Sequence, residues 1–142
     1  MNQHLAEEVI AQVLRELKLG TDPLTKGLWP VFTGSRGTDP DEIIMVTNNS
    51  IESNGRIQAT GETQGLEGVQ IRVRSLKQKS ASARVIKIAN AFDSLLRLQL
   101  TVEDKSYLVQ AVHRLGTPIA MGPDPNNRVS FALNCVASIS EE

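Results

Sequence analysis

Residues 68–75 alternate strictly between apolar and polar side chains, and a segment with a different period follows them directly. Successive side chains of a β-strand point to opposite faces, so Val69, Ile71 and Val73 share one face of the expected strand. Between residues 81 and 96, apolar side chains recur every three or four positions, as on one stripe of an α-helix: Val85, Ile88, Ala89, Phe92, Leu95 and Leu96. A half-buried strand therefore leads into a helix that can cover its apolar face.

Similar patterns recur on both sides of this pair. Strands are expected over residues 43–47, 96–102, 107–114 and 129–139. An amphipathic helix is expected to end at Gly20, with its apolar stripe at Leu5, Val9, Val13 and Leu17. Pro30 has no backbone N–H to donate, so residues 28–32 are expected to form a short or edge strand. The chain is therefore predicted to be α+β, a mainly antiparallel sheet packed on one face by an N-terminal helix and a central helix, with a polar opposite face left for a partner.

Three further stretches of the sequence lead to structural predictions. The second strand of the hairpin is expected to alternate without a break, with one face formed by Tyr107, Val109, Ala111 and His113. Residues 116–127 are rich in turn-forming side chains and have little capacity for regular structure. Residues 48–67 are long for a loop in a compact domain, and only residues 56–60 suit a brief strand. We expect this segment to become ordered against a neighbouring subunit.

Length and composition indicate one globular domain spanning residues 1–142. The chain has 142 residues, of which 40% are hydrophobic and 22% charged. No apolar run approaches the roughly 20 residues of a membrane-spanning helix, and no signal peptide is present, so we expect assembly in the cytoplasm and no membrane partner. The single cysteine, Cys135, excludes an internal disulfide and is expected to be a small buried side chain rather than a nucleophile.

Charge is distributed unevenly along the chain. Residues 72–105 contain eight basic and three acidic side chains, an excess of five positive charges, whereas residues 1–71 contain five basic and ten acidic ones. One interpretation is a solvated basic face. The other is contact with an acidic partner or with nucleic acid, at an interface or lumen surface. For that second role the candidate residues are Arg56, Arg72, Arg74, Lys77, Lys79 and Arg84.

No arrangement typical of catalysis or cofactor binding is found. His4 and His113 have no carboxylate or cysteine at metal-ligand spacing, and neither a phosphate-binding loop nor a hydrolase nucleophile motif occurs. Asp39, Asp41 and Glu42 are close enough in sequence to suggest a divalent cation, but they lack the full ligand set of a calcium loop. We therefore expect a protein that is not an enzyme and has no cofactor.

The aromatic residues are few and stand at positions expected to be packed. Platforms that stack single-stranded bases need exposed rings between positive charges. Any contact with DNA is therefore expected to involve backbone phosphates, without sequence preference.

A set of short motifs occurs in a recognisable order along the chain. They are Trp29-Pro30-Val31-Phe32-Thr33-Gly34, Pro40-Asp41 before a strand ending in Thr47, Gly55-Arg56, Gly61-Glu62, the strand from Gly68 to Arg74, a helix, a hairpin with Tyr107, and finally Arg128 with Phe131 and Asn134. In this order, over roughly residues 5–139, the chain resembles the small minor capsid or tail terminator proteins of long-tailed bacteriophages.

The resemblance implies a structural protein of the virion that forms a ring, usually of six copies, on the head-proximal end of the tail tube. Such a ring ends tube polymerisation and presents a surface to head-completion or neck proteins, and DNA passes through its centre. The basic residues would then lie in the lumen or between subunits. Two alternatives remain: a head-completion or neck adaptor protein, and a small nucleic-acid-binding module without sequence specificity.

Overall fold

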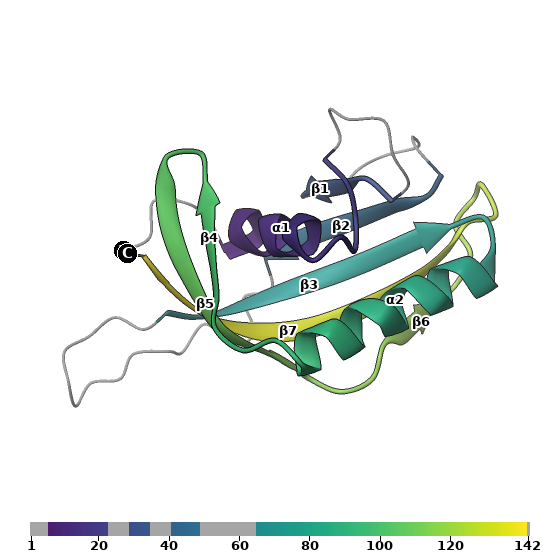
Figure 1. Ribbon diagram of the computed structural model, residues 1–142. Helices are drawn as coiled ribbons and strands as arrows, with labels where there is room; N and C mark the ends of the chain where they lie inside the picture. The colour runs from purple at the N-terminus through teal and green to yellow at the C-terminus, as the bar shows by residue number, and fades with distance from the viewer. Residues whose placement is uncertain (1–5, 23–28, 35–40, 49–64, 142) are drawn as a thin grey trace.

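The computed structural model describes residues 6–22, 29–34, 41–48 and 65–141 of the chain (Figure 1). Within these residues there are two helices, α1 (Ala6–Glu16) and α2 (Gln78–Asp93). The strands are β1 (Val31–Thr33), β2 (Ile43–Asn48), β3 (Gly65–Ser75), β4 (Leu98–Val102), β5 (Lys105–Arg114), β6 (Ile119–Met121) and β7 (Val129–Glu141).

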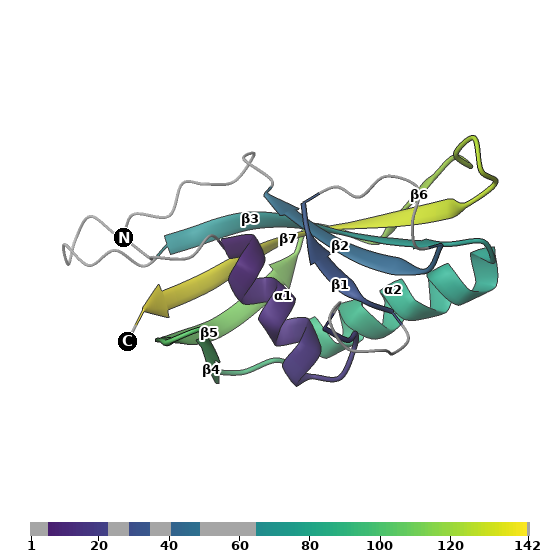
Figure 2. The same ribbon diagram turned by 90° about the horizontal axis from the view of Figure 1, so that it is seen from above.

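All these strands belong to one curled sheet, in the order β1-β2-β3-β7-β5-β4, with β6 paired to β7. Neighbours are antiparallel except β1 and β2, which are parallel. Helix α1 lies inside the curl, and α2 lies along β3 and β7 on the same side of the sheet (Figures 1 and 2). The predicted α+β fold is confirmed, and so is the short edge strand beside Pro30, since β1 ends the strand order.

The core lies between the sheet and the two helices. Val69, Ile71 and Val73 of β3 face the helices, in register with Cys135, Leu133 and Phe131 of β7, as the alternating pattern predicts. The same buried cluster includes side chains from both helices, among them Ile10, Leu14, Ile88 and Phe92. Burying a side chain of this size stabilises the fold by roughly 1.5–3 kcal/mol. The helices are therefore held mainly by their apolar stripes.

Helix α1 ends differently from the prediction. Its last residue is Glu16, and the left-handed backbone position that follows belongs to Lys18, with φ 59°, rather than to Gly20. The N–H of Leu19 donates to the carbonyl of Leu14 at 2.9 Å, and the N–H of Lys18 donates to the carbonyl of Arg15 at 3.0 Å. This is the Schellman pattern, in which the apolar residues Leu19 and Leu14 are both buried.

The expected role of Leu96 is also wrong. Helix α2 ends at Asp93 and β4 begins at Leu98, so Leu96 belongs to neither element. Its side chain is 83% exposed, whereas Leu95 is buried. Arg97, with φ 51°, adopts a left-handed conformation in this connection. The periodicity did not reveal that a short irregular segment separates the helix from the hairpin.

Two expectations about the C-terminal half need correction. The register of β5 against β7 shifts between Val109 and Ala111, so the alternation is broken and Val112, rather than Ala111, is buried in the core. Such a β-bulge moves every later side chain to the opposite face. In addition, the turn-rich region contains a strand, β6, which pairs with β7 from Ile119↔Ala132 to Met121↔Ser130.

The sheet face away from the helices is only partly polar. Gln70 donates a hydrogen bond to Asn134 across β3 and β7 at 3.0 Å, as a polar face would suggest. Ile43, Met45 and Ala132 also belong to this face, because their register partners there are Arg74 and Arg72, and all three are buried. This face therefore carries apolar side chains that the alternating pattern did not reveal.

Part of the expected long loop belongs to the sheet. Asn48 closes β2, and residues 65–67 open β3. The remaining segment, residues 49–64, lies outside the described residues, together with Arg56 and the brief strand expected over residues 56–60.

Candidate functional site

The candidate basic residues that the structure describes lie on both sides of the sheet. Arg72 and Arg74 extend from β3 on the face away from the helices, while Lys77 precedes α2 and Lys79 and Arg84 belong to it. Arg56 and the acidic residue Asp39 lie outside the described residues. The structure thus divides the basic residues into a sheet group and a helix group, and does not place them all on one surface.

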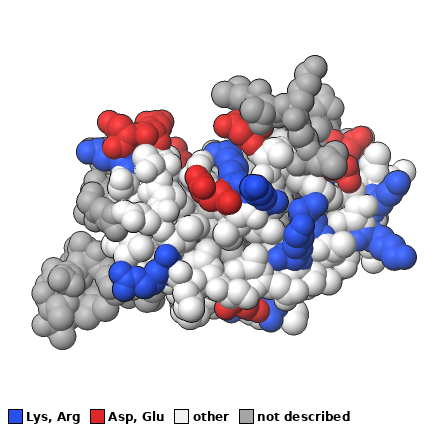
Figure 3. Space-filling view, viewed as in Figure 1, with Lys and Arg blue, Asp and Glu red and all other residues white. Residues whose placement is uncertain are grey.

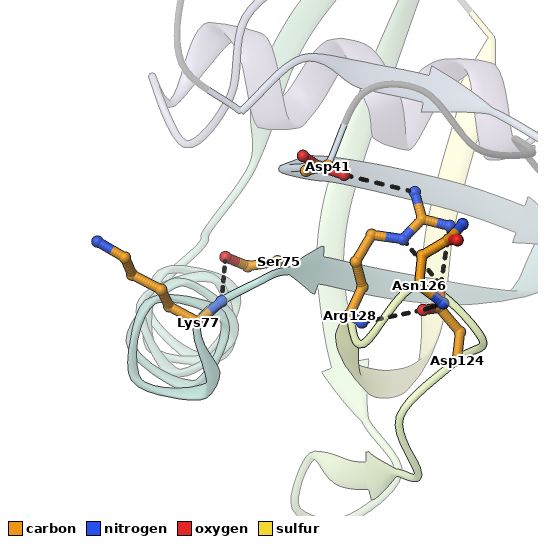
Figure 4. A network of polar contacts seen from close by, with 6 residues as sticks. All are labelled: Asp41, Ser75, Lys77, Asp124, Asn126 and Arg128. Atoms are coloured by element: carbon orange, nitrogen blue, oxygen red, sulfur yellow. Dashed lines mark hydrogen bonds and ion pairs between the residues drawn. The ribbon is translucent and has the colours of Figure 1, made fainter.

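Arg74 of the sheet group lies near a polar network centred on Arg128 and Asp124, and the charges of this network act on it. Figure 4 shows the network with Asp41 and Asn126. Nε and Nη2 of Arg128 donate to Oδ2 of Asp124, each at 2.8 Å. The other carboxylate oxygen, Oδ1, accepts the backbone N–H groups of Asn126 and Arg128, each at 2.9 Å. Asp41 lies 3.9 Å from Nη1 of Arg128. Arg128 and Arg74 are both buried, whereas the side chains of Asp124 and Asp41 are 29% and 54% exposed, so the network lies at the edge of the interior.

The charges in this network influence one another. Burial lowers the pKa of Arg74, and nearby Arg128 lowers it further, whereas Asp124 and Asp41 act in the opposite direction. The pKa of Asp124 is lowered, chiefly by the backbone hydrogen bond from Arg128. Because an arginine remains protonated even with such a shift, Arg74 is a buried cation balanced by neighbouring carboxylates. Arg74 therefore has a structural role in the folded protein.

Asp124 was not predicted to be part of any site. A signal was present in the sequence, because Asp124 stands among prolines and asparagines with Arg128 four residues later. An aspartate in such a turn often accepts backbone N–H groups from the next residues. Of the acidic residues considered for a cation, Glu42 accepts a hydrogen bond from Ser75 Oγ at 3.3 Å, and Asp41 lies 3.9 Å from Arg128. In the part of the chain that the structure describes, no three potential metal ligands are grouped.

Arg84 fastens α2 to the segment that follows α1. Its guanidinium carbon lies 5.2 Å from the centre of the Trp29 ring, a cation–π distance. Nη1 donates to the carbonyl oxygen of Leu19 at 3.2 Å. Burial lowers the pKa of Arg84, and Glu42 partly offsets this effect. Arg84 is therefore half-buried and makes two contacts within the protein.

Exposed residues at and just before α2 form a surface that we call the α2 basic face. It is defined as Leu76, Lys77, Lys79, Ile86 and Lys87. The three lysines are exposed, and Leu76 and Ile86 are 53% and 49% exposed. Basic side chains gather over α2 in the space-filling view (Figure 3). The surface combines positive charge with two exposed apolar side chains.

A surface of opposite charge lies at the other end of the molecule. The turn between β4 and β5 projects there (Figure 1). It carries Glu103 and Asp104, which are both exposed. Acidic side chains gather at this end in Figure 3. Glu7 and Glu8 begin α1, which packs against β4. We call Glu103 and Asp104 the acidic turn. The acidic turn belongs to the basic stretch 72–105 of the sequence, yet it lies at the end of the molecule opposite the start of α2 (Figure 1).

Strand β6 presents an apolar edge on the sheet face away from the helices. Ile119 and Met121 are 56% and 38% exposed, and Leu115, just before this strand, is 49% exposed. Exposed apolar side chains on a short edge strand mark a surface that can pair with another chain.

Comparison with known proteins gives a family but no curated relative. The family model described as bacteriophage tail terminator protein matches residues 6–141. No curated protein matches the chain. Among the described residues, no helix is long and apolar enough to cross a membrane.

Proposed function

This chain belongs to the bacteriophage tail terminator family and is thus a structural component of the phage tail, and from that membership we propose that it forms a ring of six copies capping the head-proximal end of the tail tube. The ring ends tube polymerisation and offers a surface to head-completion or neck proteins. The whole chain, residues 1–142, acts as one domain, without catalysis and without a cofactor. It assembles in the host cytoplasm and remains in the virion at the neck.

The observation that carries this proposal is the family match over residues 6–141, nearly the whole of the given sequence. The structure adds surfaces suited to assembly. A ring of identical copies needs two different surfaces on each copy, so that one end of a subunit meets the opposite end of the next. The α2 basic face and the acidic turn differ in this way.

The proposed partners are other copies of the chain, the tail tube protein and a head-completion or neck protein. DNA passes through the ring, and any contact is made to phosphates without sequence preference. A module whose purpose is binding nucleic acid is less well supported, because Arg74 is buried and Arg84 is held by Trp29 and by the carbonyl of Leu19. The neck adaptor alternative differs from the proposed function in one respect, since an adaptor does not stop tube growth.

Tube growth is therefore the test. Purified chain is added to polymerising tail tube protein, and tube lengths are measured by electron microscopy. We expect shorter tubes with a ring at one end, and the Gly122→Ala variant should act like the natural chain because nothing lies within 4 Å of the added methyl group. Tubes of unchanged length, together with virions that lack this chain yet have tails of normal length, would refute the proposal.

A further inference from the structure

We propose that adjacent copies in the ring meet through opposite charges, with the α2 basic face of one copy docked on the acidic turn of the next. This inference depends on the proposed function, because it assumes a ring of identical chains. The occupant of the basic face is thus a second copy of this protein, and the lysines are assigned to the interface between subunits rather than to the lumen.

The basic face has charges that the described part of the chain does not neutralise. Among residues 6–22, 29–34, 41–48 and 65–141, no ion pair is found for Lys77, Lys79 or Lys87. The first turn of α2 has no acidic residue, and the side chain of Lys77 does not cap the helix. An acidic surface from outside would therefore lower the electrostatic free energy of this region.

Leu76 and Ile86 give the same face an apolar component. Both are about half exposed, and each stands beside a lysine in the sequence, Lys77 and Lys87. Covering apolar side chains supplies affinity, whereas complementary charge determines orientation and excludes wrong partners. The face has both properties that a specific contact between subunits requires.

The acidic turn suits this role by its position. Glu103 and Asp104 form the tip of the hairpin between β4 and β5, with Val102 paired to Lys105 at its base. The tip and the start of α2 lie at opposite ends of the molecule (Figure 1). A hairpin tip protrudes, so its carboxylates can reach a neighbouring helix before the bodies of the two subunits collide.

Charge also selects the arrangement of the copies. Two basic faces repel one another, as do two acidic turns, so a symmetric pair through either surface is unfavourable. A contact between unlike ends is favourable and leaves one free surface of each kind on the pair. Further copies add in the same direction until the ring closes.

Charge reversal tests the pairing. One variant carries Lys77→Glu and Lys79→Glu, and a second carries Glu103→Lys and Asp104→Lys. Purified chains are compared by native mass spectrometry and mass photometry, with circular dichroism to confirm folding. We expect each variant to assemble at least about tenfold more weakly than the natural chain, and all four substitutions in one chain to restore assembly. Arg97→Glu, an exposed reversal outside both surfaces, is the control.

Mixing provides a stricter test. The first variant has two acidic ends and the second has two basic ends, so neither associates with itself, but an equal mixture should form rings with alternating subunits. The inference would be overturned if the charge-reversal variants assembled as well as the natural chain. It would also be overturned if the variant with all four substitutions did not regain assembly, or if the mixture formed no rings.

The outcomes separate this inference from the proposed function. If the natural chain stops tube growth but its rings ignore the reversals, the interface is wrong and the function stands. If rings respond to the reversals as described but tubes grow past them, the function is wrong and the interface stands. A natural chain that remains monomeric with and without tubes would overturn both.

Discussion

Arg128 and Asp124 are joined through side chain and backbone at once: Nε and Nη2 of the arginine reach Oδ2 of the aspartate at 2.8 Å, and the arginine N–H reaches Oδ1 at 2.9 Å. The three residues between them are thereby closed into a turn just before β7. Because Arg128 is only 4% exposed, this turn is anchored in the interior, close to Arg74.

Replacing Arg128 should weaken the fold. Arg128→Met removes three charge-assisted side-chain contacts while keeping much of the side-chain volume, so we expect the free energy of unfolding to fall by about 2 kcal/mol. Urea denaturation followed by circular dichroism measures this change. Arg97→Met replaces an exposed arginine and should change stability by less than about 0.5 kcal/mol. Equal stability of the two variants would show that the network does not stabilise the protein.

The ionisation of Asp124 should make stability sensitive to acid. Its pKa in the folded protein is lowered from the ordinary value of 3.8, chiefly by the backbone hydrogen bond from Arg128. The folded state therefore favours the ionised form. The resulting stabilisation is complete above the unfolded pKa and is lost as the pH falls through the lower folded pKa. Urea denaturation across this acidic range should show a steeper loss for the natural chain than for Asp124→Asn, and parallel curves would contradict this.

The long, regular elements were predictable from sequence, because burial enforces their periodicity. Residues 68–75 and 129–139 alternate since one face of β3 and of β7 packs on the helices. The prediction failed where a local irregularity outweighed the pattern. The β-bulge near Gln110 reverses which side chains of β5 face the core. Strand β6 forms by pairing with the edge of β7, although its three residues follow a turn-rich sequence that does not suggest a strand.

The candidate site was less predictable, because the sequence does not show on which side of the sheet each charged side chain lies. The basic residues 72–84 are close along the chain, but β3 turns into α2 between them, so Arg72 and Arg74 lie on one side of the sheet and Lys79 on the other. Sequence also did not show which arginines are buried. The partner of Arg128 is local, whereas the ring that Arg84 meets belongs to a residue 55 positions away, Trp29 (84 minus 29).

The contact between Arg84 and Trp29 should be visible by fluorescence, because the chain has one tryptophan. Arg84→Gln removes the cation over the ring and the hydrogen bond to the carbonyl of Leu19. We expect a changed emission spectrum and a loss of about 1 kcal/mol in the free energy of unfolding. Arg97→Gln, at an exposed arginine outside the α2 basic face, is the matched control and should leave both unchanged. An unaltered spectrum in Arg84→Gln would argue against the contact.

Gly20 should be intolerant of a side chain for reasons of space. A Cβ atom at this position would lie 2.8 Å from the carbonyl oxygen of Trp29 and would overlap a methyl group of Val31. Backbone on one side and a fully buried valine on the other leave little room for adjustment. Gly20→Ala should therefore lower the free energy of unfolding by about 1–3 kcal/mol. Thermal unfolding of Gly20→Ala and of the unhindered Gly122→Ala should differ by several degrees, and equal midpoints would show that the segment can shift.

The thiol of Cys135 should react only when the protein opens. It is fully buried in β7, and burial raises its pKa from 9.0 to about 12. The reactive thiolate is thus scarce at neutral pH, and reagents have no path to the sulfur. A disulfide reagent should modify the native protein no faster than the structure unfolds, and in urea the rate should rise with the unfolded fraction. Cys135→Ser removes the signal and shows that it comes from this thiol.

The contradicting outcome is rapid modification in native buffer. If its rate were proportional to reagent concentration and insensitive to stabilising salts, the centre of the sheet would be accessible to solvent. That result would contradict the packing of β7 against α2.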